Sequence, residues 1–153
     1  MPAVPGLPAL TVEGAGRATV ESWNRRSGSL RLRRGGTEAL VRVERCAAGR
    51  LRDAYPVSAH DVELVLDRAE QRAATAPVLL GALVRAVRAA DPRCRRVVYA
   101  VAEGDRVATE HAEAAGFRYA VDVDLRDEPL SLLVHEPDWV THTDMDLDRV
   151  PGS

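Results

Sequence analysis

A continuous apolar run, Val-Val-Tyr-Ala-Val at residues 97–101, constrains the fold of this chain more than any other feature. A strand with one face in solvent alternates apolar and polar residues, so an unbroken run predicts a strand that is covered on both faces. The segment before it, from Pro77 to Ala90, carries apolar residues at helical spacing and is closed by Asp91-Pro92. It predicts an amphipathic helix with proline in its first turn. A buried strand next to such a helix requires a layered fold.

The part of the chain before residue 60 is predicted to form an antiparallel meander. Its segments alternate apolar and polar residues, and Gly35-Gly36 is a hairpin signal between two of them. The strand candidates are residues 18–24, 29–33, 38–46 and a further short strand at residues 50–57.

Residues 60–72 are compatible with two structures. Ser58 and Asp61 have the spacing of a helix cap, and Val62, Val65, Leu66 and Ala69 recur at helical spacing. Residues 62, 64 and 66 also alternate as a strand would. The cap and the length favour a helix.

The last part of the domain predicts a short helix and two strands. Asp105 is placed to cap a helix that ends at Gly116, a natural left-handed C-cap. Residues 118–125 alternate strictly, and residues 130–135 form a second apolar segment after a turn.

Together these elements predict an α+β domain in which one mixed, mostly antiparallel sheet is flanked by helices. We expect a single domain from residue 11 to residue 139, a flexible Pro-rich lead at residues 1–10 and a loose acidic tail at residues 140–153.

Composition excludes several kinds of partner. A net charge of −2 and a pI near 6.1 provide no bulk attraction for nucleic acid or for acidic membranes. No apolar run reaches 18 residues, and the start of the chain lacks a basic segment. We therefore expect a cytoplasmic protein without a membrane or nucleic-acid partner. Cys46 and Cys94 are expected to be buried apolar residues, and no pair of histidines has a metal-binding spacing, so no metal is expected.

One segment resembles a known family. From Arg95 to Phe117 the chain is similar to a pattern of the GNAT acyltransferases, in which a core strand leads to a loop ending in Asn. A helix follows, with Ala three residues later and a Tyr-x-x-x-Gly-Phe element at its end. Asp105 stands at the Asn position, Ala108 at the Ala position and Gly116-Phe117 at the Gly-Phe position. The resemblance extends over about 60 residues when the preceding helix and the last two strands are included.

The resemblance implies a function. It implies a GNAT-like fold and direct transfer of an acyl group from acetyl-CoA or another acyl-CoA to a small-molecule amine. A homodimer would follow by family analogy only. The other hypotheses are a GNAT-like binding or regulatory module without catalysis and an unrelated α+β interaction protein.

Two departures from the family pattern affect this implied function. The family's glycine-rich loop presents backbone N–H groups to the CoA pyrophosphate at a helix N-terminus. Here residues 71–78 contain no glycine, and Pro77 removes one donor. The cofactor-binding candidates are Arg72, Thr75, Ala76, Val78 and Asp105. The second departure is Ala112, which replaces the tyrosine that protonates the leaving thiolate in many members of the family.

The candidate catalytic residues are acids and one histidine. Asp122 and Asp124 share a face of the strand at 118–125 and could bind a cationic amine or accept its proton, although a solvated outer face is the favoured explanation for them. His111 adjoins Ala112 but points about 100° away from it on a helix. Glu63 qualifies as a base only if residues 62–66 are the strand before the cofactor loop.

Overall fold

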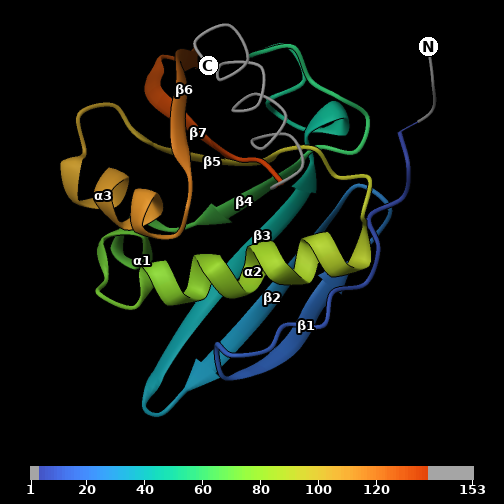
Figure 1. Ribbon diagram of the computed structural model, residues 1–153, viewed down its shortest axis with the longest axis vertical. Coiled ribbons are helices and arrows are strands. Elements are labelled where there is room, and N and C mark those ends of the chain that lie inside the picture. The colour runs from blue at the N-terminus through green and yellow to red at the C-terminus, as the bar shows by residue number, and fades with distance from the viewer. Residues whose placement is uncertain (1–3, 138–153) are drawn as a thin grey trace, which may run out of the picture.

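The computed structural model describes residues 4–137, which form seven strands, three α-helices and one turn of 3-10 helix (Figure 1). The predicted tail at residues 140–153 lies outside the described residues. The elements, in chain order, are β1 (Arg17–Trp23), β2 (Ser27–Arg34), β3 (Thr37–Arg45), η1 (Cys46–Ala48), β4 (Val62–Leu66), α1 (Arg68–Arg72), α2 (Ala76–Ala90), β5 (Val97–Ala102), α3 (Arg106–Ala114), β6 (Arg118–Leu125) and β7 (Glu128–His135).

The seven strands form one mixed sheet in the order β1-β2-β3-β4-β5-β7-β6. Five of the six neighbouring pairs are antiparallel, and β4 with β5 is the parallel pair. The predicted fold class, an α+β domain with a mostly antiparallel sheet flanked by helices, is confirmed.

Both faces of the central strands are covered, as the apolar run at 97–101 predicts. On one face, which we term the helical face, α2 crosses the sheet and α1 lies beside α3 (Figure 1). Val97, Tyr99 and Val101 of β5 belong to the core on this side. On the opposite face, Val98 and Ala100 pack with residues of the β3–β4 connection, among them Cys46, Leu51 and Tyr55.

The helix favoured for residues 60–72 is wrong. Residues 62–66 form β4, which pairs with β3 on one side and with β5 on the other. The Ser58 amide does donate to the Asp61 carboxylate, as in a capping box, but no helix follows. The buried carboxylate also accepts from the Tyr55 hydroxyl and the Arg96 amide, which ties it to neighbouring segments. The helix begins later, at α1, where Asp67 accepts a hydrogen bond from the Glu70 amide.

The strand suggested for residues 50–57 is also absent, and these residues form turns. The backbone amides of this segment donate to carbonyls nearby in the chain or to side chains. The Arg50 amide, for example, donates to the Glu44 carboxylate. Leu51 is fully buried against the sheet face. The segment therefore covers the sheet instead of extending it.

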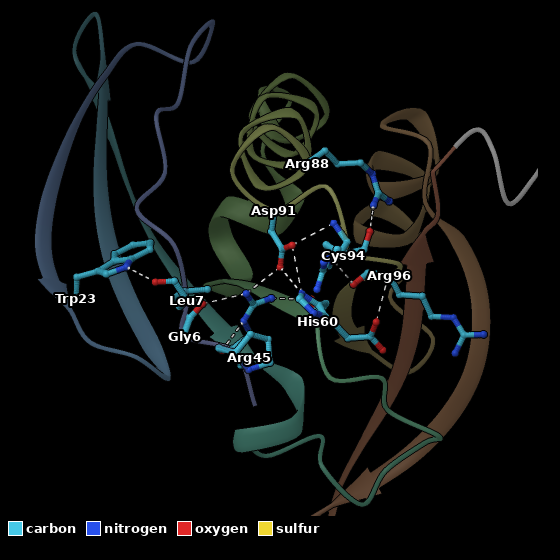
Figure 2. A network of polar contacts seen from close by, with 12 residues as sticks. Gly6, Leu7, Trp23, Arg45, His60, Arg88, Asp91, Cys94 and Arg96 are labelled. Atoms are coloured by element: carbon cyan, nitrogen blue, oxygen red, sulfur yellow. Dashed lines mark hydrogen bonds and ion pairs between the residues drawn. The ribbon is translucent and has the colours of Figure 1, made fainter. Parts of the chain in front are cut away.

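The N-terminal segment makes contacts that sequence patterns do not indicate. The Arg45 guanidinium at the end of β3 is buried and donates to the carbonyls of Pro5, Gly6 and His60 (Figure 2). It also forms an ion pair at 2.8 Å with Asp91, the residue that follows α2. Arg45 thereby joins the lead, the sheet and the end of α2.

Candidate functional site

The parallel strands β4 and β5 define the candidate site. They are paired only from Val62 with Val97 to Leu64 with Tyr99, although both strands continue further. Beyond that point lie two backbone carbonyls, those of Leu66 and Ala100, which we term the fork. Each strand leads from the fork into a helix, β4 into α1 and β5 into α3.

A side chain from α1 occupies the fork. The buried Gln71 carboxamide donates to the Leu66 carbonyl at 3.3 Å and to the Ala100 carbonyl at 2.9 Å. These two bonds satisfy backbone acceptors that the interrupted strand pairing leaves without a ladder partner.

An ion pair joins α1 to α3 above the fork. Arg72 lies 2.7 Å from one oxygen of Asp105, and Arg68 lies 3.7 Å from the other oxygen. Asp105 also accepts from the Ala108 amide and caps α3, as predicted. Burial alone would raise the pKa of Asp105, but the Ala108 amide and Arg72 hold it below its ordinary value. Two of the predicted cofactor-binding residues, Arg72 and Asp105, are thus brought together, and each already has the other as its ion-pair partner.

The loop before α2 has few free donors for an anion. The Ala76 amide already donates to the Ala73 carbonyl at 2.9 Å, and Pro77 has no N–H. Thr75 and Val78 are exposed and line a cavity of about 130 Å³ between this loop and strands β2 and β3. The candidate anion donors are therefore the Val78 amide and the Thr75 hydroxyl.

The predicted catalytic residues lie on different elements. His111 is on α3, and its Nδ1 lies 3.2 Å from the Gln71 carbonyl, which places the imidazole at the α1–α3 contact. Asp122 and Asp124 are exposed on the edge strand β6. Asp122 accepts a hydrogen bond from Ser131 of β7 at 2.7 Å. Among the described residues, no hydrogen bond or ion pair links either aspartate to His111 or to the fork, and their catalytic roles stay predictions.

Glu63 fulfils the condition under which the sequence made it a candidate base, because residues 62–66 form the strand before the predicted cofactor loop. It lies on the face of the sheet opposite α2, and its side chain is 1% exposed. Arg50 contacts it at 2.7 Å. Burial raises the pKa of the Glu63 carboxyl above its ordinary value, against the opposing effect of Arg50.

A cavity of about 300 Å³ lies over the same face of the sheet. Its wall includes Val98, the residue paired with Glu63 across β4 and β5. Tyr55, Tyr119 and Leu132 contribute aromatic and apolar surface, and Glu136 contributes a carboxylate that pairs with Arg118. A cavity of this size and lining suits a small organic molecule.

Tyr99 is a polar residue at the site that sequence reasoning missed. It belongs to the apolar run of β5, its side chain is fully buried, and its hydroxyl has no hydrogen-bond partner among the described residues. The signal was available in the sequence, because a tyrosine inside a buried strand carries a hydroxyl that needs a partner.

This arrangement of one mixed sheet with a parallel β4–β5 pair and three helices is GNAT-like. Among solved structures, the chain is similar to the aminoglycoside acetyltransferase AAC(6')-Ib in complex with coenzyme A and kanamycin. The TM-score is 0.61 at 17% identity, over 77% of this chain and 71% of that one.

Two further acetyltransferases share the fold. RimJ of Mycobacterium smegmatis, in complex with CoA-disulfide, has a TM-score of 0.54 at 12% identity over 74% of this chain and 54% of that one. The spermidine N-acetyltransferase SpeG of Vibrio cholerae has a TM-score of 0.51 at 10% identity over 72% and 65%. The chain spans 66% of AAC(6')-Ib as solved with acetyl-CoA.

No family model matches the sequence, and no curated protein matches it. Within residues 4–137, no helix is long and apolar enough to cross a membrane. In the same range, no group of three His, Cys, Asp or Glu residues is arranged to hold a metal ion. Cys46 and Cys94 are buried and free, as expected.

Proposed function

We propose that the protein is an acyl-CoA-dependent N-acyltransferase that acts on a small amine. The observation that carries the proposal is the fork between β4 and β5, set in a fold shared with acetyltransferases solved with coenzyme A or acetyl-CoA. The ordered match of Asp105, Ala108 and Gly116-Phe117 to the GNAT pattern supports it independently.

Glu63 is the proposed base for the acceptor amine. A buried carboxyl with a raised pKa holds a proton more strongly than an exposed one, so it is better suited to take the proton that the attacking amine loses. The 300 Å³ cavity beside it on the same face is the proposed acceptor pocket. Its volume supports a small amine over a protein substrate. Arg50 is placed to keep Glu63 ionised between turnovers.

The proposed cofactor contacts are those of the α1–α2 loop. Arg72 and Thr75, with the Val78 amide, would hold the phosphates, and Asp105 would release Arg72 for this role. Ala76 would contribute shape rather than a donor, since its amide is already bonded. Fewer donors than in a glycine-rich loop predict weaker binding of CoA.

Asp122, Asp124 and His111 are kept as the alternative acid–base set. The Ser131 hydroxyl already donates to Asp122, and His111 already contacts the Gln71 carbonyl. Both would have to exchange these partners for a substrate.

One observation favours a second function, that of a GNAT-like binding or regulatory module without turnover. Gln71 occupies the fork, and Arg72 is paired with Asp105. A protein that uses its own side chains at these places has no need of a cofactor to complete the fold.

Binding and turnover are separate tests. Acetyl-CoA should raise the melting temperature of the wild type, and Arg72→Glu should abolish the shift by placing a negative charge at the phosphates. Thiol release from acetyl-CoA with a panel of small amines then measures turnover. Binding without turnover would support the module, and no thermal shift with any acyl-CoA up to millimolar concentration would contradict the proposal.

Glu63→Gln tests the base. We expect kcat to fall on the order of 100-fold or more, the range that a lost general base produces, while acetyl-CoA still raises the melting temperature. Glu110→Gln, on the exposed side of α3, is the matched control. Asp122→Asn and Asp124→Asn should retain activity. If activity were lost in these variants and kept in Glu63→Gln, the role of the base would pass from Glu63 to the alternative acid–base set.

A further inference from the structure

The cavity of about 300 Å³ on the sheet face opposite α2 carries an uneven set of charges. Among the described residues that line it, the charged side chains are those of Arg96, Arg118 and Glu136. Two guanidinium groups accompany one carboxylate, so the wall has a net positive charge. The rest of the lining is apolar or aromatic, and such surroundings screen a charge less than water does.

Glu136 already has cationic partners within the protein. Its side chain is 7% exposed, Arg118 donates to one of its oxygens, and the Arg96 Nε lies 3.8 Å from the other oxygen. An amine with several positive charges would therefore meet two arginines and, among the described residues of the lining, a carboxylate that is already paired. The charges of the cavity disfavour a polycationic acceptor.

The two arginines keep donors for an anionic ligand. Arg118 gives Glu136 one hydrogen bond from a terminal nitrogen, and its side chain is 65% exposed. The Arg96 side chain is 33% exposed. A guanidinium has five N–H donors in a planar fork that matches the two oxygens of a carboxylate. A ligand carboxylate can therefore bind Arg118 while Glu136 keeps its hydrogen bond.

The strand pairing places Arg118 and the proposed base at the two ends of one row across the sheet. Glu63 pairs with Val98, Val98 pairs with Val134, and Val134 pairs with Arg118. Side chains directly opposite each other in neighbouring strands project to the same face of a sheet. The row therefore runs from a carboxyl group, over two valines, to a guanidinium.

A β-bulge in β6 adds apolar surface next to Arg118. The pairing of β6 with β7 shifts its register at Ala120, which is the extra residue. Arg118 pairs with Val134, and Val121 pairs with Leu132, two residues before Val134 in β7. Arg118 and Val121 thereby face the cavity together. Val121 is 38% exposed, so this apolar surface is open to the side chain of a ligand.

We propose that the acceptor is an amino acid with an apolar side chain; this rests on the proposed acyltransferase function. Arg118, with Arg96 beside it, holds the carboxylate, the apolar wall holds the side chain, and the amine lies toward Glu63. In the transfer, the ammonium loses one proton to solvent through Glu63, and its nitrogen forms a bond to the acyl carbon. The C–S bond breaks with its electron pair on sulfur, which takes a second proton from the nitrogen. The products are an N-acyl amino acid, CoA and one proton.

Matched acceptors test the carboxylate. With acetyl-CoA, the kcat/KM for L-phenylalanine and for L-leucine should exceed that for the corresponding amides by about tenfold or more, the range that a hydrogen bond to a charged group provides. The amine of an amino-acid amide loses its proton more readily than that of the acid, so a preference for the acid runs against amine reactivity. Spermidine, a polycation, should be the poorest acceptor.

The variant Arg118→Gln isolates the contact. It should lower kcat/KM for the acids about tenfold, mainly through KM, and leave the amides unchanged, while Arg118→Lys should keep part of the preference. Arg126→Gln, at an exposed arginine in the turn of the same hairpin and outside the cavity lining, should behave as the wild type. Turnover with equal kcat/KM for acids and amides, or a preference that Arg118→Gln keeps, would overturn the inference and leave the proposed function intact.

A binding measurement tests the site without turnover. In isothermal titration calorimetry, N-acetyl-L-phenylalanine should bind the wild type more tightly than N-acetyl-L-phenylalaninamide, and Arg118→Gln should lose the difference. Neither ligand has a titrating amine, so the comparison reports the carboxylate alone. This result would support the carboxylate site even in a protein that releases no thiol from acetyl-CoA. Equal affinities, or binding of neither ligand, would overturn it.

Discussion

Asp105 combines three interactions in one carboxylate. It caps α3 through the Ala108 amide, pairs with Arg72 at 2.7 Å and lies within ion-pair distance of Arg68. The GNAT pattern has Asn at this position, and an amide can cap a helix but cannot form the ion pairs. The negative charge is therefore what ties α1 to α3 in this chain.

The consequence for stability can be measured with two substitutions. Asp105→Ala should lower the free energy of unfolding at pH 7 by about 1–2 kcal/mol through the lost cap. Asp105→Asn keeps the cap and should lose less. Denaturant titration of both variants and the wild type gives the difference, and equal losses would show that the charge alone matters.

The same comparison has a defined pH dependence. The pKa of folded Asp105 is depressed, so the unfolded state binds the proton first as the pH falls. The extra stability of the wild type over Asp105→Asn should be complete above the ordinary aspartate pKa of about 4 and should decline as the pH falls through the folded pKa. An advantage that stays constant down to the most acid pH at which both proteins remain folded would contradict this assignment.

Arg45 is the residue whose loss should destabilise the fold most. Its guanidinium is 2% exposed and satisfies three backbone carbonyls as well as Asp91 (Figure 2). Arg45→Met removes the charge and leaves Asp91 and these carbonyls buried without it. We expect a loss of about 3–5 kcal/mol in the free energy of unfolding.

Arg42→Met is the matched control for Arg45, since Arg42 lies on the same strand with a 55% exposed side chain. It should cost less than about 1 kcal/mol. Similar losses for the two variants would show that the buried network contributes little.

At the scale of elements, β4 shows how pairing overrides local pattern. Residues 62–66 carry both a helical and a strand-like spacing, and the hydrogen bonds of β3 and β5 decide between them. The helix expected for residues 60–72 is short enough to be only marginally stable on its own, whereas a strand inserted between two others satisfies its backbone on both sides. The assignment also turns Glu63 from a solvated helix residue into a buried carboxyl.

α1 is a short helix that places Gln71 in the fork. Gln71→Ala removes both bonds to the Leu66 and Ala100 carbonyls, and we expect a loss of about 1–3 kcal/mol for leaving them unsatisfied. CoA carries amide groups that can donate to the same carbonyls. The thermal shift produced by CoA should therefore be larger in Gln71→Ala than in the wild type.

Ala69→Ser is the control, because Ala69 lies on the same helix and its side chain is exposed. It should show the wild-type thermal shift. A smaller CoA-dependent shift in Gln71→Ala would mean that Gln71 contributes to the cofactor site instead of competing for it.

At the scale of the whole molecule, the sheet separates the two proposed half-sites. The helical face carries the fork and the loop between α1 and α2, and the opposite face carries Glu63 and the 300 Å³ cavity. In the proposed transfer, the acyl donor and the amine would meet at the interrupted pairing of β4 and β5. This division agrees with the proposed transfer between two separately bound substrates.

Much of the architecture was predictable from the sequence because it depends on local periodicity. The buried strand at 97–101, the helix before it, the helix capped by Asp105 and the last two strands each carry a spacing or a cap within a few residues. The spacing from Arg95 to Phe117 predicted the acyltransferase fold for the same reason, since it lies within one continuous segment.

Only the tertiary structure decided which side chains meet. The strand at 62–66, the bridge from Gln71 to Ala100, the pairing of Arg72 with Asp105 and the burial of Arg45 all join residues that lie far apart in the sequence. Their free energies arise from burial and from satisfying polar groups across elements, and neither can be computed from the spacing within one element. The buried run that constrained the fold also carries Tyr99, and only the tertiary structure shows that its hydroxyl is buried without a hydrogen-bond partner among the described residues.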